Sequence, residues 1–387
     1  MDLNNKRVVA RFDFNVPLND KGEITDTTRV DKALPTIKYI LENGAKSLVL
    51  MSHLGRPKGE VKPEFSLEPV ATYLAEKLGQ EVVLTESCKD KGIKTLLDLP
   101  KTKVVLLQNL RFHKEETEND TEFARTLSNY GEIYVNDAFG AAHRKHASTY
   151  GINAFFSRRA CGGFLMKAEV EALQKVVDKP AHPFVAIVGG AKVSDKIKII
   201  EALLSEVDGL LIGGAMAYPF LKAQGYDIGK SLCSEEDVKL AKKILSQKTA
   251  SKIMLPSDHV VSQEFGGTPE PCDDVSIDEN KMGLDIGPKT QALYGEKLRS
   301  AKTVLWNGPM GLFENEDYAK GTFFIAKTLS ELEGVFTLVG GGDSVSAVNK
   351  SGLAQKMSHV STGGGASLEF IENGSLPGVQ ALKFCLN

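Results

Sequence analysis

Short apolar runs rich in β-branched residues alternate with amphipathic stretches along the whole chain, and this alternation constrains the fold more than any other feature. The runs are VVARFDF, SLVLMSH, EVVL, VVLLQNLRF and IYVNDAFG in the first half, and FVAIVGG, LLIGG, KIMLPSD, TVLWNG, FTLVGGG and HVSTGGG in the second. Between them lie stretches with apolar residues at helical spacing, such as LPTIKYILENG and EEDVKLAKKILSQ. Such series build mostly parallel sheets covered by helices, with ligands bound beyond the carboxyl ends of the strands. The sequence therefore predicts an α/β fold.

The length of 387 residues exceeds the size at which a single hydrophobic core stops growing, so we expect two Rossmann-like lobes. The boundary is expected near the helical segment Lys167 to Lys179, just before Pro180 and Pro183. We predict that this helix is the hinge between a first domain, residues 1–166, and a second, residues 167–373.

The two halves differ in chemistry. Of ten arginines, nine lie before position 160, whereas 27 of the 36 glycines lie after it. Arginine forks suit compact phosphate and carboxylate groups. Glycine at a strand-to-helix turn lets the backbone approach an extended phosphate chain. We therefore expect different anionic ligands in the two lobes.

In the first half, cations recur where the predicted strands end. RFDFNVP ends a run with a cation, a carboxylate and an amide, and SHLGRP follows the run SLVLM. Each motif alone reads equally well as an ordinary turn, and surface salt bridges explain one or two such arginines. Their recurrence in loops after strands favours an anion pocket. The cations concerned are Arg29, His53, Arg56, Arg111 and Arg144.

In the second half, VGGAKVSDKI places Lys192 and Lys196 four residues apart, and we expect both on one face at the start of a helix. Lysines on an exposed helix face are commonplace, so neither alone indicates a phosphate site. Asp343 in LVGGGDS reads either as a helix N-cap or as a ligand of Mg²⁺ beside nucleotide phosphates. STGGGASLE provides a further glycine-rich turn into a helix.

Several classes of protein are disfavoured. The chain has neither G-x-x-x-x-G-K-[ST] nor G-x-G-x-x-G, which argues against P-loop NTPases, dinucleotide enzymes and protein kinases. His143 and His146 lack the further ligands of a metal site. The net charge of -3 gives no global bias toward nucleic acid or membranes. Five cysteines without a C-x-x-C pair, and an N-terminus without an apolar stretch, predict a reduced, cytoplasmic protein.

The ordered motifs RFDFNVP, SHLGRP, NLRFH, DAFGAAHR, GGAKVSDKI, MGLDIGP, WNGPMGLFE, GGGDS and STGGGASLE closely resemble the phosphoglycerate kinase family, over nearly the whole chain. The resemblance implies reversible phosphoryl transfer between 1,3-bisphosphoglycerate and ADP, giving 3-phosphoglycerate and ATP in glycolysis. It also implies that the first domain binds 3-phosphoglycerate, that the second binds the Mg²⁺ complex of ADP or ATP, and that residues 374–387 pack back on the first domain. A monomer is expected.

The resemblance also implies roles for single residues. Asp13 and Asn15 would contact polar groups of the substrate, and Arg29, His53, Arg56, Arg111 and Arg144 would surround its phosphates. In the second domain, Asp343 would position the metal, and the nucleotide would contact Lys192, Lys196, Gly213, Gly214, Gly283, Leu284, Asn307, Glu314, Gly341, Gly342, Asp343 and Ser344. The transferring phosphoryl group would be stabilised by Arg29, Lys192, Gly341 and Gly364.

Four positions depart from the family pattern: Phe12, Gln108, Ala215 and Lys281. Ala215 and Lys281 fall near the expected adenine pocket, so they bear on nucleotide affinity more than on chemistry. We expect the two lobes to close on their substrates, to exclude water and align the reactants. The alternative from another class is a non-catalytic two-lobed protein that closes on an anion, which would not need Lys192, Lys196 and Asp343 together.

Overall fold

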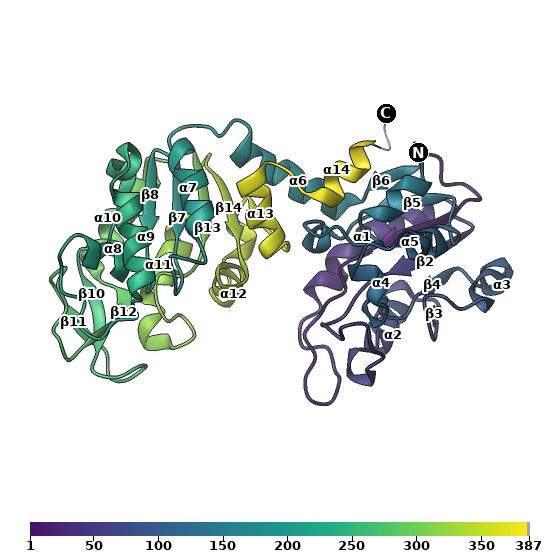
Figure 1. Ribbon diagram of the computed structural model, residues 1–387, viewed down its shortest axis with the longest axis horizontal. Helices are drawn as coiled ribbons and strands as arrows, with labels where there is room; N and C mark the ends of the chain where they lie inside the picture. Colours follow the sequence, from purple (N-terminus) through teal and green to yellow (C-terminus); the bar gives the residue numbers. More distant parts are fainter. Residues whose placement is uncertain (385–387) are drawn as a thin grey trace. The chain divides into compact units, whose positions relative to one another are not determined.

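The computed structural model describes residues 1–384, which form two compact units. Unit 1 comprises Met1–Glu171 and the described residues from Ser375 onward, and unit 2 comprises Ala172–Gly374. The division falls within α6 (Phe164–Val177), five residues beyond the position expected from the sequence. Each unit is built on a six-stranded parallel sheet (Figure 1), which confirms the predicted fold class. No helix in residues 1–384 has the length and apolar character needed to cross a bilayer.

The sheet of unit 1 has the strand order β3-β4-β2-β1-β5-β6, so the chain builds outward from β1 first on one side and then on the other. In parallel sheets the carboxyl edge at such a reversal is where ligands bind. The strands are β1 (Arg7–Arg11), β2 (Ser47–Met51), β3 (Val82–Leu84), β4 (Val104–Leu106), β5 (Ile133–Asn136) and β6 (Ala160–Gly162). The helices are α1 (Thr28–Glu42), α2 (Glu68–Leu78), α3 (Gly92–Asp98), α4 (Lys114–Thr117), α5 (Thr121–Ser128) and α14 (Pro377–Phe384), with the short 3₁₀ turn η2 (Leu110–Phe112).

Both faces of this sheet are buried, which is why its strands read as continuous apolar runs. Along β1, Val8 and Ala10 pack with α1 and α2 on one face, and Val9 packs with α3 and α5 on the other. The alternation follows from the two-residue repeat of a strand. The sheet is therefore a fixed platform from which the loops at its carboxyl edge project.

Unit 2 repeats this design with the order β15-β14-β13-β7-β8-β9, reversing at β7. Its strands are β7 (Phe184–Val188), β8 (Gly209–Ile212), β9 (Ile253–Met254), β13 (Thr303–Asn307), β14 (Phe336–Gly340) and β15 (His359–Val360). Its helices are α7 (Ile197–Glu206), α8 (Ala217–Ala223), α9 (Glu235–Leu245), α10 (Pro288–Arg299), α11 (Lys320–Ser330), α12 (Gly342–Lys350) and α13 (Gly365–Asn373). Helices α10, α11 and α12 cover one face around Trp306, and α7 packs against β7 and β8.

Unit 2 also contains a small antiparallel sheet, which the sequence did not reveal. Its strands are β10 (His259–Ser262), β11 (Glu270–Cys272) and β12 (Met282–Ile286), in the order β11-β10-β12. β10 (HVVS) and β11 (EPC) are short and partly polar, without the long apolar run that marks a strand buried on both faces. Gly283 and Leu284 lie within β12, so this sheet brings them to the cavity described below.

Candidate functional site

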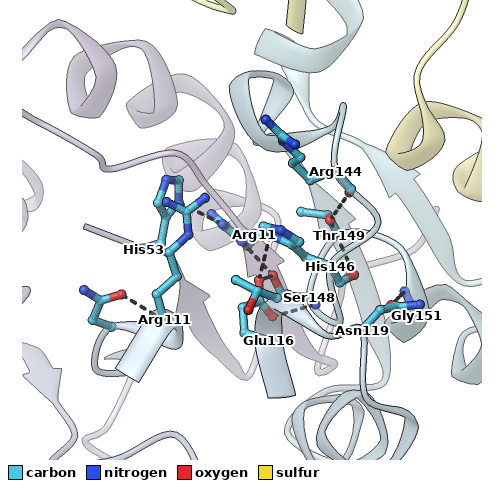
Figure 2. A network of polar contacts seen from close by, with 12 residues as sticks. Arg11, His53, Arg111, Glu116, Asn119, Arg144, His146, Ser148, Thr149 and Gly151 are labelled. Carbon is cyan, nitrogen blue, oxygen red and sulfur yellow. Dashed lines mark hydrogen bonds and ion pairs between the residues drawn. The ribbon is translucent and has the colours of Figure 1, made fainter. Parts of the chain in front are cut away.

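In unit 1, the cationic side chains gather at the carboxyl edge of the sheet (Figure 2). Arg11 is the last residue of β1, His53 follows β2, and Arg111 lies in η2, just after β4. Arg144 lies in the loop that follows β5. The carboxyl ends of parallel strands share one edge, so residues up to 137 positions apart in the sequence meet there. The parallel topology of the sheet therefore brings these predicted cations together at one edge.

The loops after β1 and β2 are tied together by polar side chains. Arg29, at the second position of α1, donates from Nη1 to Oδ2 of Asp13. The other oxygen of Asp13 accepts from the backbone N–H of Asn15 at 3.2 Å. Oδ1 of Asn15 accepts from the N–H of Gly55 at 2.8 Å. Asp13 and Asn15 thus fix the position of Arg29 and the shape of the loop that carries His53 and Arg56.

The arginines differ in exposure, and this separates those that can reach a ligand from those that cannot. Arg56 and Arg144 are exposed and the Arg29 side chain is 35% exposed, whereas Arg11 is completely buried. Arg111 lies between these extremes. Its Nη1 donates to the carbonyl of Gly55 at 2.9 Å, but its buried Nε has no hydrogen-bond partner within residues 1–384.

An unpaired buried guanidinium N–H is costly, so it indicates a position prepared for an acceptor that is not part of the chain. Burial lowers the pKa of Arg111 to about 10, and the neighbouring charge of Arg11 acts in the same direction. The group therefore remains protonated at neutral pH. It is a charged donor with free hydrogen-bonding capacity at the edge of the cluster.

The two buried histidines of the cluster are neutral at pH 7. Burial, reinforced by Arg11 and Arg111, holds the pKa of His53 well below its usual value. Burial and the same arginines lower the pKa of His146 to about 3. The positive charge of the site therefore comes from guanidinium groups, and His53 contributes an uncharged ring. This arrangement suits a small ligand with several negative charges.

In unit 2, the first glycine-rich loop follows β7. Lys196 donates from Nζ to Oδ1 of Asn307, whose Nδ2 donates to the carbonyl of Gly340 at 2.9 Å. Burial lowers the pKa of Lys196, and the nearby Asp343 opposes that shift. Lys196 is thus a half-buried cation held in place by the buried Asn307 amide.

The expectation that Lys192 and Lys196 share one face of a helix is wrong. Helix α7 begins only at Ile197, so Lys192 lies in an exposed loop and Lys196 is the residue that precedes the helix. The physical reason is a tertiary bond: the N–H of Ser194 donates to Oδ1 of Asp237 in α9 at 2.8 Å, which holds this segment as a turn. The two ammonium groups therefore have different environments, one exposed and one partly buried.

A cavity of about 360 Å³ opens among the glycine-rich loops of unit 2. Most of its lining is apolar or backbone, with Phe265, Leu232 and Met282 at its sides. Five of the predicted nucleotide-binding residues line it: Gly214, Gly283, Leu284, Glu314 and Asp343. Within the described chain, the predicted residues outside this lining are Lys192, Lys196, Gly213, Asn307, Gly341, Gly342 and Ser344.

At two positions of this cavity, any residue with a Cβ atom would clash with its neighbours. Gly214 has φ +67°, and a Cβ there would lie 2.7 Å from the backbone nitrogen of Gly190. A Cβ on Gly283 would lie 2.0 Å from the Tyr218 hydroxyl oxygen. Glycine at these two positions therefore lets the backbone itself form part of the cavity wall. The size of the cavity and its apolar walls suit a planar ring system with polar groups at one end.

Two helix N-termini complete the site in unit 2. Gly341 (φ +88°) precedes α12 and Gly364 (φ +53°) precedes α13, and neither helix has a side-chain cap. Their first backbone N–H groups are thus available to an anion. The hydroxyl of Ser344, which was expected to contact the nucleotide, is buried and accepts from the N–H of Gly308. Asn307 is likewise buried and supports Lys196.

The carboxylate of Asp343 is exposed in the first turn of α12 and lines the cavity. No group of three or more His, Cys, Asp or Glu side chains in the described residues is arranged to hold a metal ion. A single carboxylate beside an uncapped helix N-terminus fits Mg²⁺, which binds through one or two carboxylates together with phosphate oxygens. It does not fit a dedicated protein cage, such as a structural zinc site.

The two departures from the family pattern in unit 2 have different consequences. Ala215 lines the cavity, where a small side chain leaves its wall open. Lys281 is not part of the described lining, and its Nζ pairs with Oε2 of Glu270 at 2.6 Å, which links β11 to the residue before β12. Of the two, only Ala215 therefore bears directly on the shape of the cavity.

Sequence reasoning did not assign any role to Glu116, Ser148 or the Arg11 side chain, although all three are fully buried in the cluster. Glu116 stands in the segment KEET, whose composition is typical of an exposed helix. One signal was available for Arg11, because it directly follows the apolar residues Val8, Val9 and Ala10 of a strand expected to be buried. A charged residue at such a position requires buried partners.

The chain was compared with known proteins. Residues 1–374 match the family model described as phosphoglycerate kinase. A phosphoglycerate kinase of Clostridium novyi is 51% identical over 390 aligned residues, covering 99% of this chain and 97% of the relative. One from an Anaeromyxobacter species is 52% identical, covering 99% and 98%.

Solved structures agree with this match. The phosphoglycerate kinase structure from Coxiella burnetii superposes with a TM-score of 0.89 at 41% identity, covering 99% of this chain and 97% of that one. The structure from Pyrococcus horikoshii gives a TM-score of 0.86 at 33% identity, covering 100% and 98%.

Proposed function

The chain belongs to the phosphoglycerate kinase family, and on that premise we propose how its residues carry out the family reaction. The enzyme is a phosphotransferase with a carboxyl acceptor: it transfers a phosphoryl group reversibly between 1,3-bisphosphoglycerate and ADP, giving 3-phosphoglycerate and ATP. The non-catalytic anion-binding alternative is not favoured. The assignment of residues, metal, oligomeric state and location below is our proposal.

Unit 1 binds the phosphoglycerate. Arg56, Arg144 and Arg29 are at least partly exposed at the carboxyl edge of its sheet, and they surround the phosphate groups. Arg111 adds a further protonated guanidinium to this cluster. The gathering of these guanidinium groups at one edge of the sheet is the single observation that carries the assignment, because it suits a small ligand with several negative charges. Asp13 and Asn15 shape the pocket through their bonds to Arg29 and Gly55. Asp13 also accepts from hydroxyl groups of the substrate.

Unit 2 binds the nucleotide. The adenine occupies the cavity lined by Gly214, Gly283 and Leu284, with Gly213 next to it in the chain, and Glu314 contacts the ribose. The phosphates extend toward Lys192, Lys196 and the helix N-terminus at Gly341 and Gly342. Asp343 would hold Mg²⁺, which would supply positive charge to neutralise the phosphates.

Transfer requires in-line alignment and positive charge around the equatorial oxygens, with little covalent participation by the protein. Arg29 of unit 1 and Lys192 of unit 2 supply that charge, and the backbone N–H groups at Gly341 and Gly364 add hydrogen bonds. A general base is not needed, because the acceptor carboxylate is already ionised at neutral pH. The two units close on their substrates to exclude water from the acyl phosphate.

The partners of this enzyme are its small-molecule substrates, and we propose that it acts as a monomer in the cytoplasm. The cytoplasmic location is supported by the glycolytic reaction and by the cysteines in the described residues, Cys88, Cys161, Cys233 and Cys272, all of which are free thiols.

The function is tested by measuring ADP formation from ATP, with 3-phosphoglycerate and Mg²⁺ each omitted in turn. Arg111→Ala is expected to abolish calorimetric binding of 3-phosphoglycerate while ATP binding remains. Arg125→Ala is the matched control, since this arginine of unit 1 pairs with Glu122 and lies over the Phe155 ring. If ATP consumption is independent of 3-phosphoglycerate, the proposed function is wrong.

A further inference from the structure

A buried chain of hydrogen bonds runs behind the proposed phosphoglycerate pocket and ends at His53 (Figure 2). Its members are Glu116, Ser148, Arg11 and His53, and their side chains are almost completely removed from solvent. Glu116 lies in α4, Ser148 follows β5, and Arg11 ends β1. Three segments distant in sequence therefore converge on the loop that carries His53.

The direction of each bond in this chain is determined by the chemistry of its groups. Nε of Arg11 donates to Oγ of Ser148 at 2.9 Å, because a guanidinium has no acceptor. The Ser148 hydroxyl has one proton, which it donates to Oε1 of Glu116 at 2.6 Å. The backbone N–H of Ser148 donates to Oε2 of Glu116 at 3.0 Å. Both carboxylate oxygens thus accept from one residue, which in turn accepts from Arg11.

The same reasoning fixes the tautomer of His53. Nη2 of Arg11 lies 3.0 Å from Nδ1 of His53, and because arginine only donates, Nδ1 must carry the lone pair. The ring is neutral in this environment, so its proton is on Nε2. His53 therefore offers a defined N–H donor from Nε2 without adding another positive charge.

Arg11 itself cannot contact the substrate, because its side chain has no exposure and its donors are engaged with Ser148, His53 and the carbonyl of Phe12. Its charge needs a buried counterion. Glu116 is the carboxyl group that reaches it, through the Ser148 hydroxyl; burial raises the pKa of Glu116, while Arg11 and the two bonds from Ser148 oppose that shift and favour the carboxylate. His146 also approaches Glu116, with Nδ1 at 3.9 Å from Oε1, but it is neutral and adds no charge.

We propose that Glu116 is a positioning residue for the phosphoglycerate pocket: through Ser148 and Arg11 it holds His53 as the neutral Nε2–H tautomer that donates to the substrate. This inference rests on the proposed function of unit 1. It adds a residue outside the pocket whose loss changes the hydrogen-bonding state of a residue inside it. Removal of the Glu116 charge leaves Arg11 without its counterion, so Arg11 shifts and Nδ1 of His53 loses its donor.

The first measurement is the tautomer itself. Long-range ¹H–¹⁵N correlation of the protein labelled with ¹⁵N-histidine distinguishes Nε2–H from Nδ1–H, and His53→Gln assigns the signal among the seven histidines. In the wild-type enzyme we expect the neutral Nε2–H form at pH 7. In Glu116→Gln and in Ser148→Ala we expect mixed tautomers or a protonated ring. A wild-type His53 that is cationic or carries its proton on Nδ1 overturns the inference.

The second measurement is the steady-state kinetics of the same variants. Loss of a hydrogen bond to a charged substrate is expected to raise the KM for 3-phosphoglycerate about ten- to a hundredfold, with the KM for ATP changed less than twofold. The double variant is expected to be no worse than the more affected single variant, since both act on one chain of bonds. Ser148→Ala carries the test if Glu116→Gln does not fold.

Tyr134→Phe is the matched control. The Tyr134 hydroxyl donates to the backbone carbonyl of Ser148 at 2.7 Å, so its loss removes a buried bond to the same residue without touching the Glu116–Ser148–Arg11 chain. We expect a lower urea midpoint but an unchanged His53 spectrum and KM. If Glu116→Gln matches this control in all three readouts, Glu116 is only structural. If the wild-type enzyme does not use 3-phosphoglycerate at all, the proposed function fails while the tautomer result stands.

Discussion

Gly341 occupies a backbone conformation that only glycine tolerates, and its substitution by alanine should destabilise unit 2 by a calculable amount. Its φ of +88° and ψ of 142° lie in a region that costs other residues about 1–3 kcal/mol. A Cβ there would also lie 2.5 Å from Nδ2 of Asn307. Asn307 must then move, which breaks its 2.9 Å bond to the carbonyl of Gly340, a loss of about 1 kcal/mol. The two contributions predict a loss of about 2–4 kcal/mol.

The single tryptophan makes this loss directly measurable. Trp306 is completely buried in β13, next to Asn307, so its fluorescence reports the unfolding of unit 2. With a urea dependence of about 2–3 kcal/mol/M for a unit of this size, the midpoint of Gly341→Ala should fall by about 1 M. Because Lys196 loses its Asn307 acceptor, the KM for ATP should rise as well.

Gly342→Ala is the matched control for stability. A Cβ at Gly342 meets no atom within 4 Å, and the residue begins α12, where alanine is favoured over glycine by about 1 kcal/mol. Its midpoint should therefore equal or exceed that of the wild-type protein. A Gly341→Ala midpoint within about 0.2 M of the wild-type value would refute the reasoning from backbone strain and the Asn307 contact.

Three further outcomes are expected. Arg29→Ala should lower kcat by roughly 10³-fold, because a charge that stabilises the transferring group is lost; a variant with near-normal turnover would remove Arg29 from that role. Asp343→Asn should weaken calorimetric binding of Mg-ATP and leave 3-phosphoglycerate binding unchanged, and equal losses for both ligands would contradict the metal assignment. Lowering the pH from 7 to 5 should cost less stability in His146→Gln than in the wild-type protein, measured as urea midpoints by circular dichroism. In the folded protein the pKa of His146 is lowered to about 3, whereas in the unfolded chain it is about 6.5. Below about pH 6.5 the unfolded chain therefore binds a proton that the folded chain excludes, so the free energy of unfolding of the wild-type protein falls as the pH is lowered. Equal pH effects in the two proteins would contradict this reasoning.

The sequence predicted the strands and the loops of the site because both leave local signals. A strand buried on both faces, such as β2, is a continuous apolar run, and parallel topology brings the residues that follow such runs to one edge. The convergence of His53, Arg111 and Arg144 at one edge of the sheet was predicted in this way, and their roles at a ligand stay a prediction.

The sequence could not predict features that depend on tertiary contacts. The start of α7 is set by the bond from Ser194 to Asp237, which lies 43 positions away. Glu116 is buried because α4 packs behind the cluster, although its own segment resembles an exposed helix. The hydroxyl of Ser344 is buried because it accepts from the N–H of Gly308, 36 positions away. In each case the partner, and not the residue's neighbours in sequence, decides its role.

The distribution of carboxylates in unit 1 explains how a cationic cluster forms in a chain with a net charge of -3. Arg11 is balanced by Glu116 through Ser148, and Arg29 is held by Asp13. Both carboxylates are at least nine-tenths buried, so they lie on the side of the cations that faces away from solvent. They stabilise the fold without occupying the exposed sides of Arg56 and Arg144. Because His53 is kept neutral, it does not add to the repulsion among the guanidinium groups. The cluster can therefore be fully charged toward an incoming anion and still be compatible with a folded, unliganded unit.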